Sequence, residues 1–235
     1  MIVLTSWDDG YPSDLRIANL LSKFGLKGTF FLPLNNIEGR AVLTSSQIKL
    51  IASNFEIGGH TLDHVYLNSL SHENLKRQVI QCRLKLMDLI SNPVHGFCYP
   101  GGKVTPAAEM AVREAGFTYA RTIVNLNYDI YSDQYRMPTT IQFFPHSKTA
   151  YLSNYLRYGF YKTRISALKQ IFSANSFQER LRALADDCLT KGKVFHIWGH
   201  SWEIDEYHLW EELESFFSYL ASLPHEAKNL NEIIA

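Results

Sequence analysis

Short apolar runs alternate along the chain with longer stretches in which apolar residues recur every three to four positions. The short runs predict buried β-strands and the longer stretches predict covering helices, an order typical of βα units in a parallel sheet. The expected strands are residues 2–7, 28–34, 55–58, 96–99, 117–123 and 194–198. The expected helices are residues 13–23, 47–53, 72–90, 105–116 and 206–223, with most of 150–190.

This pattern predicts one α/β domain over residues 1–235, with about seven βα units that close or nearly close into a barrel. Residues 145–190 are a candidate helical insertion packed on the core, and residues 125–146 are expected to be irregular. In such a barrel the functional site lies at the carboxyl ends of the strands.

Composition narrows the functional classes. With 46% hydrophobic and 20% charged residues, a disordered chain is excluded. The 23 basic residues balance the 23 acidic ones, so we expect no nucleic-acid partner, and no apolar stretch is long enough to predict a membrane span. The first residues lack the features of a secretion signal and the three cysteines form no CxxC pair, so we expect a cytoplasmic location.

Polar clusters follow three of the expected strands. They are Asp8-Asp9-Gly10, the segment from His60 to His64, and Gly199-His200. If residues 60–64 form a helical turn, His60 and His64 share one face and can bind one metal ion. Asp9 is the natural third ligand. The other aspartate of the pair, Asp8, can then serve as a general base. Zinc is the default for two histidines and a carboxylate, although Co2+, Ni2+ or Fe2+ also suit such a site.

Two histidines compete for the role of general acid. His196 and His200 fall on the same face of the expected strand, about 13 Å apart at 3.3 Å per residue. His200 would lie near the rim of the barrel, and His196 would lie deep inside it, where a hydrogen-bonded core histidine is the better interpretation. We therefore favour His200.

At these residues the chain resembles the polysaccharide deacetylase family, also called the NodB-homology or carbohydrate esterase family 4 domain. The resemblance rests on Thr5-Ser6-Trp7-Asp8-Asp9-Gly10 and on His60-Thr61-Leu62-Asp63-His64, with Gly28-Thr29-Phe30-Phe31 as a further match. Family order and spacing hold from residue 1 to about 123 and resume near residue 192.

The resemblance implies a distorted (β/α) barrel, similar to a TIM barrel, that binds a divalent metal ion. Asp8 would be the base, and Asp9, His60 and His64 the metal ligands. A metal-bound water would attack an amide carbonyl, a backbone N–H of the third motif would help to stabilise the oxyanion, and His200 would protonate the leaving amine.

The third motif departs from the commonest family pattern. The segment reads Phe97-Cys98-Tyr99-Pro100-Gly101-Gly102, with Cys98 where the family often has an arginine that pairs with the base. Arg121 and Arg136 are the candidates to replace it. The fourth motif, an aspartate near a tryptophan, has no clear match.

Aromatic residues beside the motifs suggest where a sugar ring would bind, although an aromatic at a strand end is more often part of the core. The candidate substrate-binding residues are Tyr99, Pro100, Gly101, Trp198 and Trp202. The basic and aromatic stretch 155–169 is either a binding site for an anionic partner or an amphipathic surface helix.

These features together predict a metal-dependent hydrolase of carbohydrate metabolism that removes an N-acetyl group from an amino sugar or glycan. One alternative is a deformylase, or another hydrolase of linear amide or imide C–N bonds, that uses the same metal site. The other is a catalytically silent carbohydrate-binding barrel, which the altered third motif would suit but the presence of Asp8 argues against.

Overall fold

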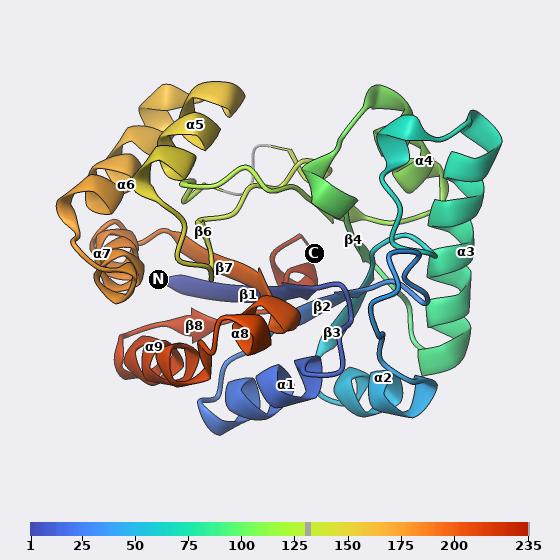
Figure 1. Ribbon diagram of the computed structural model, residues 1–235, viewed down its shortest axis with the longest axis horizontal. Helices are drawn as coiled ribbons and strands as arrows, with labels where there is room; N and C mark the ends of the chain where they lie inside the picture. Colours follow the sequence, from blue (N-terminus) through green and yellow to red (C-terminus); the bar gives the residue numbers. More distant parts are fainter. Residues whose placement is uncertain (130–132, 235) are drawn as a thin grey trace.

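A computed structural model describes residues 1–129 and 133–234 of the chain (Figure 1). Residues 130–132, in the segment expected to be irregular, lie outside the described part. The strands are β1 (Ile2–Asp8), β2 (Thr29–Leu32), β3 (Glu56–Gly59), β4 (Gly96–Cys98), β5 (Tyr119–Arg121), β6 (Ile141–Gln142), β7 (Val194–His200) and β8 (Glu226–Ala227).

The strands form one parallel sheet in the order β5-β4-β3-β2-β1-β7-β6, and β8 pairs with the start of β1. Strand β1 lies inside the sheet between β2 and β7, and it pairs with β7 over its whole length. Within the described residues β5 and β6 do not pair, and one bridge between Arg121 and Met137 spans part of the gap. The fold is therefore the expected α/β distorted barrel, and its sheet is not fully closed.

Helices surround this sheet. They are α1 (Asp14–Lys23), α2 (Ser45–Ala52), α3 (His72–Ile90), α4 (Pro106–Glu114), α5 (Lys148–Tyr158), α6 (Tyr161–Ser173), α7 (Phe177–Thr190), α8 (Ser201–Glu206) and α9 (Trp210–Ser222), with short 3-10 helices at Leu67–Ser69, Pro100–Gly102 and Asn231–Ile233. Hydroxyl side chains cap several of them, as at Thr44, Ser71 and Thr105. No helix within the described ranges has the length and apolar character needed to cross a bilayer.

The two sides of the sheet pack differently. The side facing the helices carries the larger hydrophobic cluster, which includes Val3 and Trp7 of β1. A smaller cluster inside the barrel contains Leu4, Phe31 and Cys98. Because side chains alternate along a strand, the inner position of Leu4 places Asp8, four residues later, on the same inner side.

Several expected boundaries were wrong. Strand β7 continues through His200, because its ladder with β1 runs on to pair Asp8 with His200. The helix expected over residues 206–223 begins later, as α9 at Trp210, because His208 has a left-handed backbone with φ of 55°; the short helix α8 before it was not expected. Strand β6 was not expected, because two residues are too few to show a period.

Candidate metal and catalytic site

Three parallel strands bring the sequence clusters to one end of the barrel. Asp8 and His200 are the last residues of β1 and β7, and they are direct neighbours in the ladder. His60 follows the last residue of β3. Asp9 has a left-handed backbone with φ of 75°, and Gly10 has φ of 61°, so the chain turns sharply after β1. This turn lets two consecutive aspartates reach the same cavity, as expected.

Residues 60–64 do not form the helical turn that would place His60 and His64 on one face. Thr61 and His64 have positive φ values of 63° and 53°, so the segment is a bend and not a turn of right-handed helix. The hydroxyl of Thr61 accepts a hydrogen bond from the backbone N–H of Val65 at 3.0 Å, which stabilises the bend. The two imidazoles nevertheless meet, with ring centroids 5.2 Å apart.

The side chains of Asp9, His60 and His64 converge as a metal donor set. Asp9 Oδ1 lies 3.2 Å from Nε2 of His60 and 3.0 Å from Nε2 of His64. The Nδ1 of His60 lies 2.8 Å from the carbonyl oxygen of Cys98. Since a carbonyl can only accept, Nδ1 carries the proton in the neutral ring and Nε2 turns a lone pair toward Asp9.

Asp9 Oδ1 is buried and has no hydrogen-bond partner among the described residues, whereas Oδ2 accepts a hydrogen bond from the indole N–H of Trp202 at 2.9 Å. An unpartnered carboxylate oxygen and two imidazole nitrogens suit a divalent cation such as zinc. Burial would raise the pKa of Asp9, but the charge of His200 and the close contacts with the imidazoles of His60 and His64 hold it well below its usual value. Asp9 is therefore ionised, as a ligand must be.

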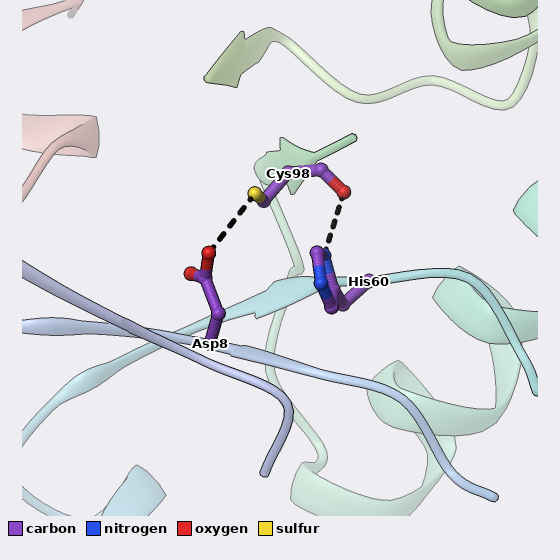
Figure 2. A group of neighbouring side chains, drawn as sticks. All are labelled: Asp8, His60 and Cys98. Atoms are coloured by element: carbon purple, nitrogen blue, oxygen red, sulfur yellow. Dashed lines mark hydrogen bonds between the residues drawn. The ribbon is translucent and has the colours of Figure 1, made fainter. Parts of the chain in front are cut away.

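A second group of donors, Asp8, His60 and Cys98, fits a metal less well (Figure 2). Burial raises the pKa of the Cys98 thiol well above its usual value, so the thiolate that would bind a metal is disfavoured. The thiol instead lies 3.5 Å from Asp8 Oδ2, to which it can donate. Cys98 thus bridges the site, because its carbonyl orients His60 and its thiol contacts Asp8.

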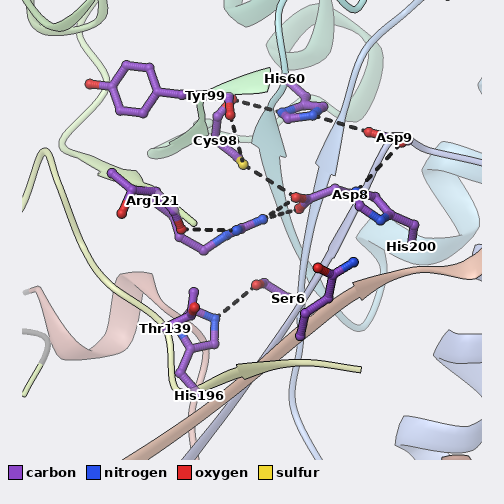
Figure 3. Close-up of polar contacts among 12 residues, drawn as sticks. Ser6, Asp8, Asp9, His60, Cys98, Tyr99, Arg121, Thr139, His196 and His200 are labelled. Carbon is purple, nitrogen blue, oxygen red and sulfur yellow. Dashed lines mark hydrogen bonds and ion pairs between the residues drawn. The ribbon is translucent and has the colours of Figure 1, made fainter. Parts of the chain in front are cut away.

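Arg121 supplies the arginine that the third motif lacks (Figure 3). Its guanidinium is fully buried, and its Nη2 donates to both oxygens of Asp8. In the ladder of β4 and β5, Arg121 is the direct partner of Cys98, so the arginine lies one strand away from the usual position. Arg136, the other candidate, is half exposed and pairs with Glu109 at 2.7 Å.

The charge of Arg121 controls the ionisation of Asp8. Burial alone would raise the pKa of this carboxyl, but Arg121, together with His60 and His200, lowers it below its ordinary value. Asp8 is therefore a carboxylate at neutral pH and can accept a proton.

The two candidate acids differ as expected in their surroundings. His200 lines the cavity, its Nδ1 lies 2.7 Å from Glu203 Oε2, and its Nε2 lies 3.8 Å from Asp9. Burial would lower its pKa, but Asp9 and Glu203 raise it to about 9. His196 is fully buried against the hydroxyl of Ser6 at 2.9 Å, and burial lowers its pKa to about 3. His200 is thus protonated at neutral pH and His196 is not.

The two aspartates and the three histidines His60, His64 and His200 line one cavity of about 320 Å3. Of the candidate substrate-binding residues, Tyr99, Gly101, Trp198 and Trp202 line it, and Pro100 is buried outside it. The phenol of Tyr99 points away from the aspartates in Figure 3 and donates to the carbonyl of Tyr135 at 3.2 Å, so the backbone and not the ring faces the cavity.

Sequence reasoning missed several residues of this site. Glu38, Arg40 and Tyr66 also line the cavity, and the guanidinium of Arg40 lies 3.8 Å from the ring centroid of Trp202. Glu203 was noticed only as a neighbour of His200. The available signal was its spacing, because Glu203 is the third residue of α8 and His200 is the N-cap residue, and side chains at these two positions often meet.

Comparisons with known proteins agree with this geometry. The family model described as polysaccharide deacetylase matches residues 1–120. The sequence is 27% identical over 117 residues to YxkH of Bacillus subtilis (strain 168), a protein named as a polysaccharide deacetylase. That match covers 49% of this chain and 42% of YxkH. The sequence is 25% identical over 118 residues to a peptidoglycan-N-acetylglucosamine deacetylase of Bacillus cereus, over 49% of this chain and 54% of that protein. The matched region thus spans about half the length of these relatives.

A solved structure supports the fold. A family 4 acetyl xylan esterase from Clostridium thermocellum, in complex with a cobalt ion, superimposes with a TM-score of 0.61. The alignment covers 99% of this chain and 90% of the esterase at 16% sequence identity. At that identity the likeness concerns the architecture, and the chemistry must be argued from the residues of this chain.

Proposed function

The chain belongs to the polysaccharide deacetylase family, and from this premise we propose that it is a metal-dependent hydrolase that removes the N-acetyl group from an amino sugar or glycan. The observation that carries the proposal is the meeting of Asp8, Asp9, His60, His64 and His200 around one cavity at the ends of β1, β3 and β7. Zinc is the metal that the donor set favours.

Asp9, His60 and His64 are the proposed ligands. A divalent cation in such a site supplies Lewis-acid polarisation of the amide carbonyl and makes water more acidic. The carbonyl of Cys98 fixes the orientation of His60, and the indole of Trp202 fixes the second oxygen of Asp9. These contacts hold the ligands in place before a cation arrives.

Asp8 and His200 divide the proton transfers. Asp8, ionised beside Arg121, accepts a proton from the attacking water. His200, protonated and held by Glu203, delivers a proton to the leaving nitrogen. The two groups lie on neighbouring strands in direct register, so both face one amide in the cavity.

The first experiment measures bound metal by elemental analysis and acetate release from N-acetylglucosamine oligomers. Asp9→Asn is expected to lose most of the bound metal and the activity. Asp63→Asn is the matched control, because Asp63 lies in the same segment but its carboxylate accepts from Gln78 at 2.6 Å. If Asp63→Asn and Asp9→Asn lose metal equally, the ligand assignment is wrong.

Catalytic roles are separated from metal binding by two further variants. Asp8→Asn and His200→Asn are expected to keep the metal and to lose activity by about 10²–10⁴-fold, the usual contribution of a positioned acid or base. Release of formate from formamide substrates, without acetate release, would instead support a deformylase. Glycan binding without turnover across several metals would support a silent binding barrel.

A further inference from the structure

The hairpin formed by α5 and α6 exposes an unusual number of large apolar side chains. Figure 1 shows the two helices at the outside of the molecule, on the opposite side of the view from α3. Phe160 in the turn is 72% exposed and Leu156 is 59% exposed. The full set, which we call the hairpin face, is Leu152, Leu156, Phe160, Tyr161, Ile165 and Phe172.

The hairpin itself carries charge of one sign, although Asp133 lines a cavity together with Arg157, and Asp187 accepts a hydrogen bond from Ser166 of α6. Residues 134–178 contain no aspartate or glutamate, although the whole chain is neutral. The same stretch contains six basic residues, namely Arg136, Lys148, Arg157, Lys162, Arg164 and Lys169. In the described part of the chain no ion pair is formed by Arg157, Lys162 or Lys169, and all three are exposed. A basic strip therefore borders the apolar one.

The hairpin is held in place by internal contacts. Buried Arg164 donates to the backbone carbonyls of Asn125, Tyr155 and Gly159, and to the side chain of Asn154 at 2.7 Å. These bonds fix the turn between α5 and α6 to the barrel. The exposed side chains of the hairpin face therefore lie on a helical hairpin that is fixed to the barrel.

The hairpin also lies beside the catalytic cavity. A second cavity of about 440 Å3 is lined by Arg157, Tyr158 and Phe160 of the hairpin. Ile123 lines both this cavity and the catalytic one. A surface that bound the hairpin face would therefore come close to the entrance of the catalytic site.

We infer that the hairpin face binds the surface of an anionic phospholipid bilayer. Aromatic and aliphatic side chains on one strip, with lysine and arginine beside them, are typical of helices that lie in a membrane interface. Pairing with a second copy of the chain would bring two acid-free basic strips together, so like charges would oppose it. At an anionic bilayer the apolar side chains can enter the boundary between headgroups and acyl chains, and the anionic headgroups attract the lysine and arginine side chains.

Co-sedimentation with vesicles tests the inference on the full chain. Binding is expected to vesicles of phosphatidylcholine with 30% phosphatidylglycerol, to weaken as salt rises, and to be at least tenfold weaker to phosphatidylcholine alone. Lys162→Glu with Lys169→Glu is expected to reduce partitioning by 25-fold or more, from about fivefold per charge removed. Leu156→Ser with Phe160→Ser is expected to reduce it similarly.

Matched controls make the same changes elsewhere on the surface. Lys49→Glu with Lys85→Glu changes the charge equally, and Leu50→Ser with Leu84→Ser removes exposed apolar groups from α2 and α3. These variants are expected to bind like the unaltered protein, and circular dichroism checks that all variants are folded. Equal losses in the control and hairpin variants would overturn the inference. So would absence of binding to the anionic vesicles, or a dimer in light scattering that the hairpin variants abolish without any vesicle binding.

Discussion

At the scale of single residues, one buried ion pair sets the chemistry of Asp8. Arg121 lies fully inside the barrel and Asp8 is its carboxylate partner. Removing one member of such a pair leaves an uncompensated charge in a region of low dielectric. The pair therefore affects both the stability of the fold and the ability of Asp8 to accept a proton.

The two arginines that the sequence offered provide a direct comparison. Arg121→Met is expected to lower the free energy of unfolding by about 3–5 kcal/mol and to reduce the proposed deacetylation at least about 10²-fold. Arg136→Met removes only half-exposed pairs with Glu109 and Asp133, so we expect a loss below about 1 kcal/mol and unchanged turnover. Chemical denaturation and kcat measurements distinguish the two. Similar effects of both substitutions would contradict the role assigned to Arg121.

The sequence predicts most of the candidate site residues but does not choose between these arginines. Asp8, Asp9, His60 and His64 were found because they follow expected strands in recognisable motifs. Arg121 acts on Asp8 across 113 residues of sequence, and only the parallel register of β4 and β5 reveals the contact. The left-handed backbone that brings His64 to His60 has no sequence signal either, because Thr61 and His64 are not glycine.

At the scale of elements, the packing of the sheet depends on a glycine in one strand that leaves room for an aromatic ring of the next strand. A Cβ atom at Gly96 in β4 would overlap the ring of Tyr119 in β5. That ring cannot easily move, because its hydroxyl donates to Glu56 in β3 at 2.8 Å. Gly96, Tyr119 and Glu56 therefore tie the three adjacent strands β3, β4 and β5 together.

A double-mutant cycle tests this packing. Gly96→Ala alone is expected to lower the free energy of unfolding by about 1–3 kcal/mol, because overpacking forces the strand or the ring to shift. In a Tyr119→Leu background the same substitution is expected to cost less, with a coupling of about 0.5–3 kcal/mol between the two sites. Urea denaturation of the four proteins gives the coupling. A purely additive result would show that the ring does not limit the space at Gly96.

The elements that were predicted well are those with a long period or a clear cap. Helix α3 was placed from residue 72 to 90, because Leu75, Val79, Cys82, Leu86 and Leu89 recur every three to four positions along it. Strand β6 and helix α8 were missed, since the first has two residues and the second follows β7 without a loop. Short elements are fixed by their tertiary neighbours, which a sequence pattern does not show.

At the scale of the whole molecule, buried titratable groups link folding to pH. Burial raises the pKa of Asp14 well above its ordinary value and also raises that of Glu56. Burial lowers the pKa of His196 to about 3. The two acids bind protons more readily in the folded state and the histidine less readily, so they shift the pH dependence of stability in opposite directions.

The contribution of His196 can be isolated by substitution. An unfolded histidine binds a proton near pH 6.5, whereas the folded one stays neutral down to about pH 3. Between these values the unfolded state binds more protons, so this group lowers the free energy of unfolding as the pH falls, by up to about 1.4 kcal/mol per pH unit. Above pH 7 it has no such effect.

His196→Gln keeps a polar side chain beside Ser6 and removes the titration. We expect the stability advantage of the unaltered protein over this variant to shrink by about 1–1.4 kcal/mol per unit as the pH falls from 6 to 4. The same advantage is expected to stay constant between pH 7 and 8. Denaturation at each pH, with equal metal content in both proteins, measures the difference. An advantage that is constant from pH 8 to 4 would mean that His196 becomes protonated inside the fold, and His196 would then be a candidate general acid beside His200.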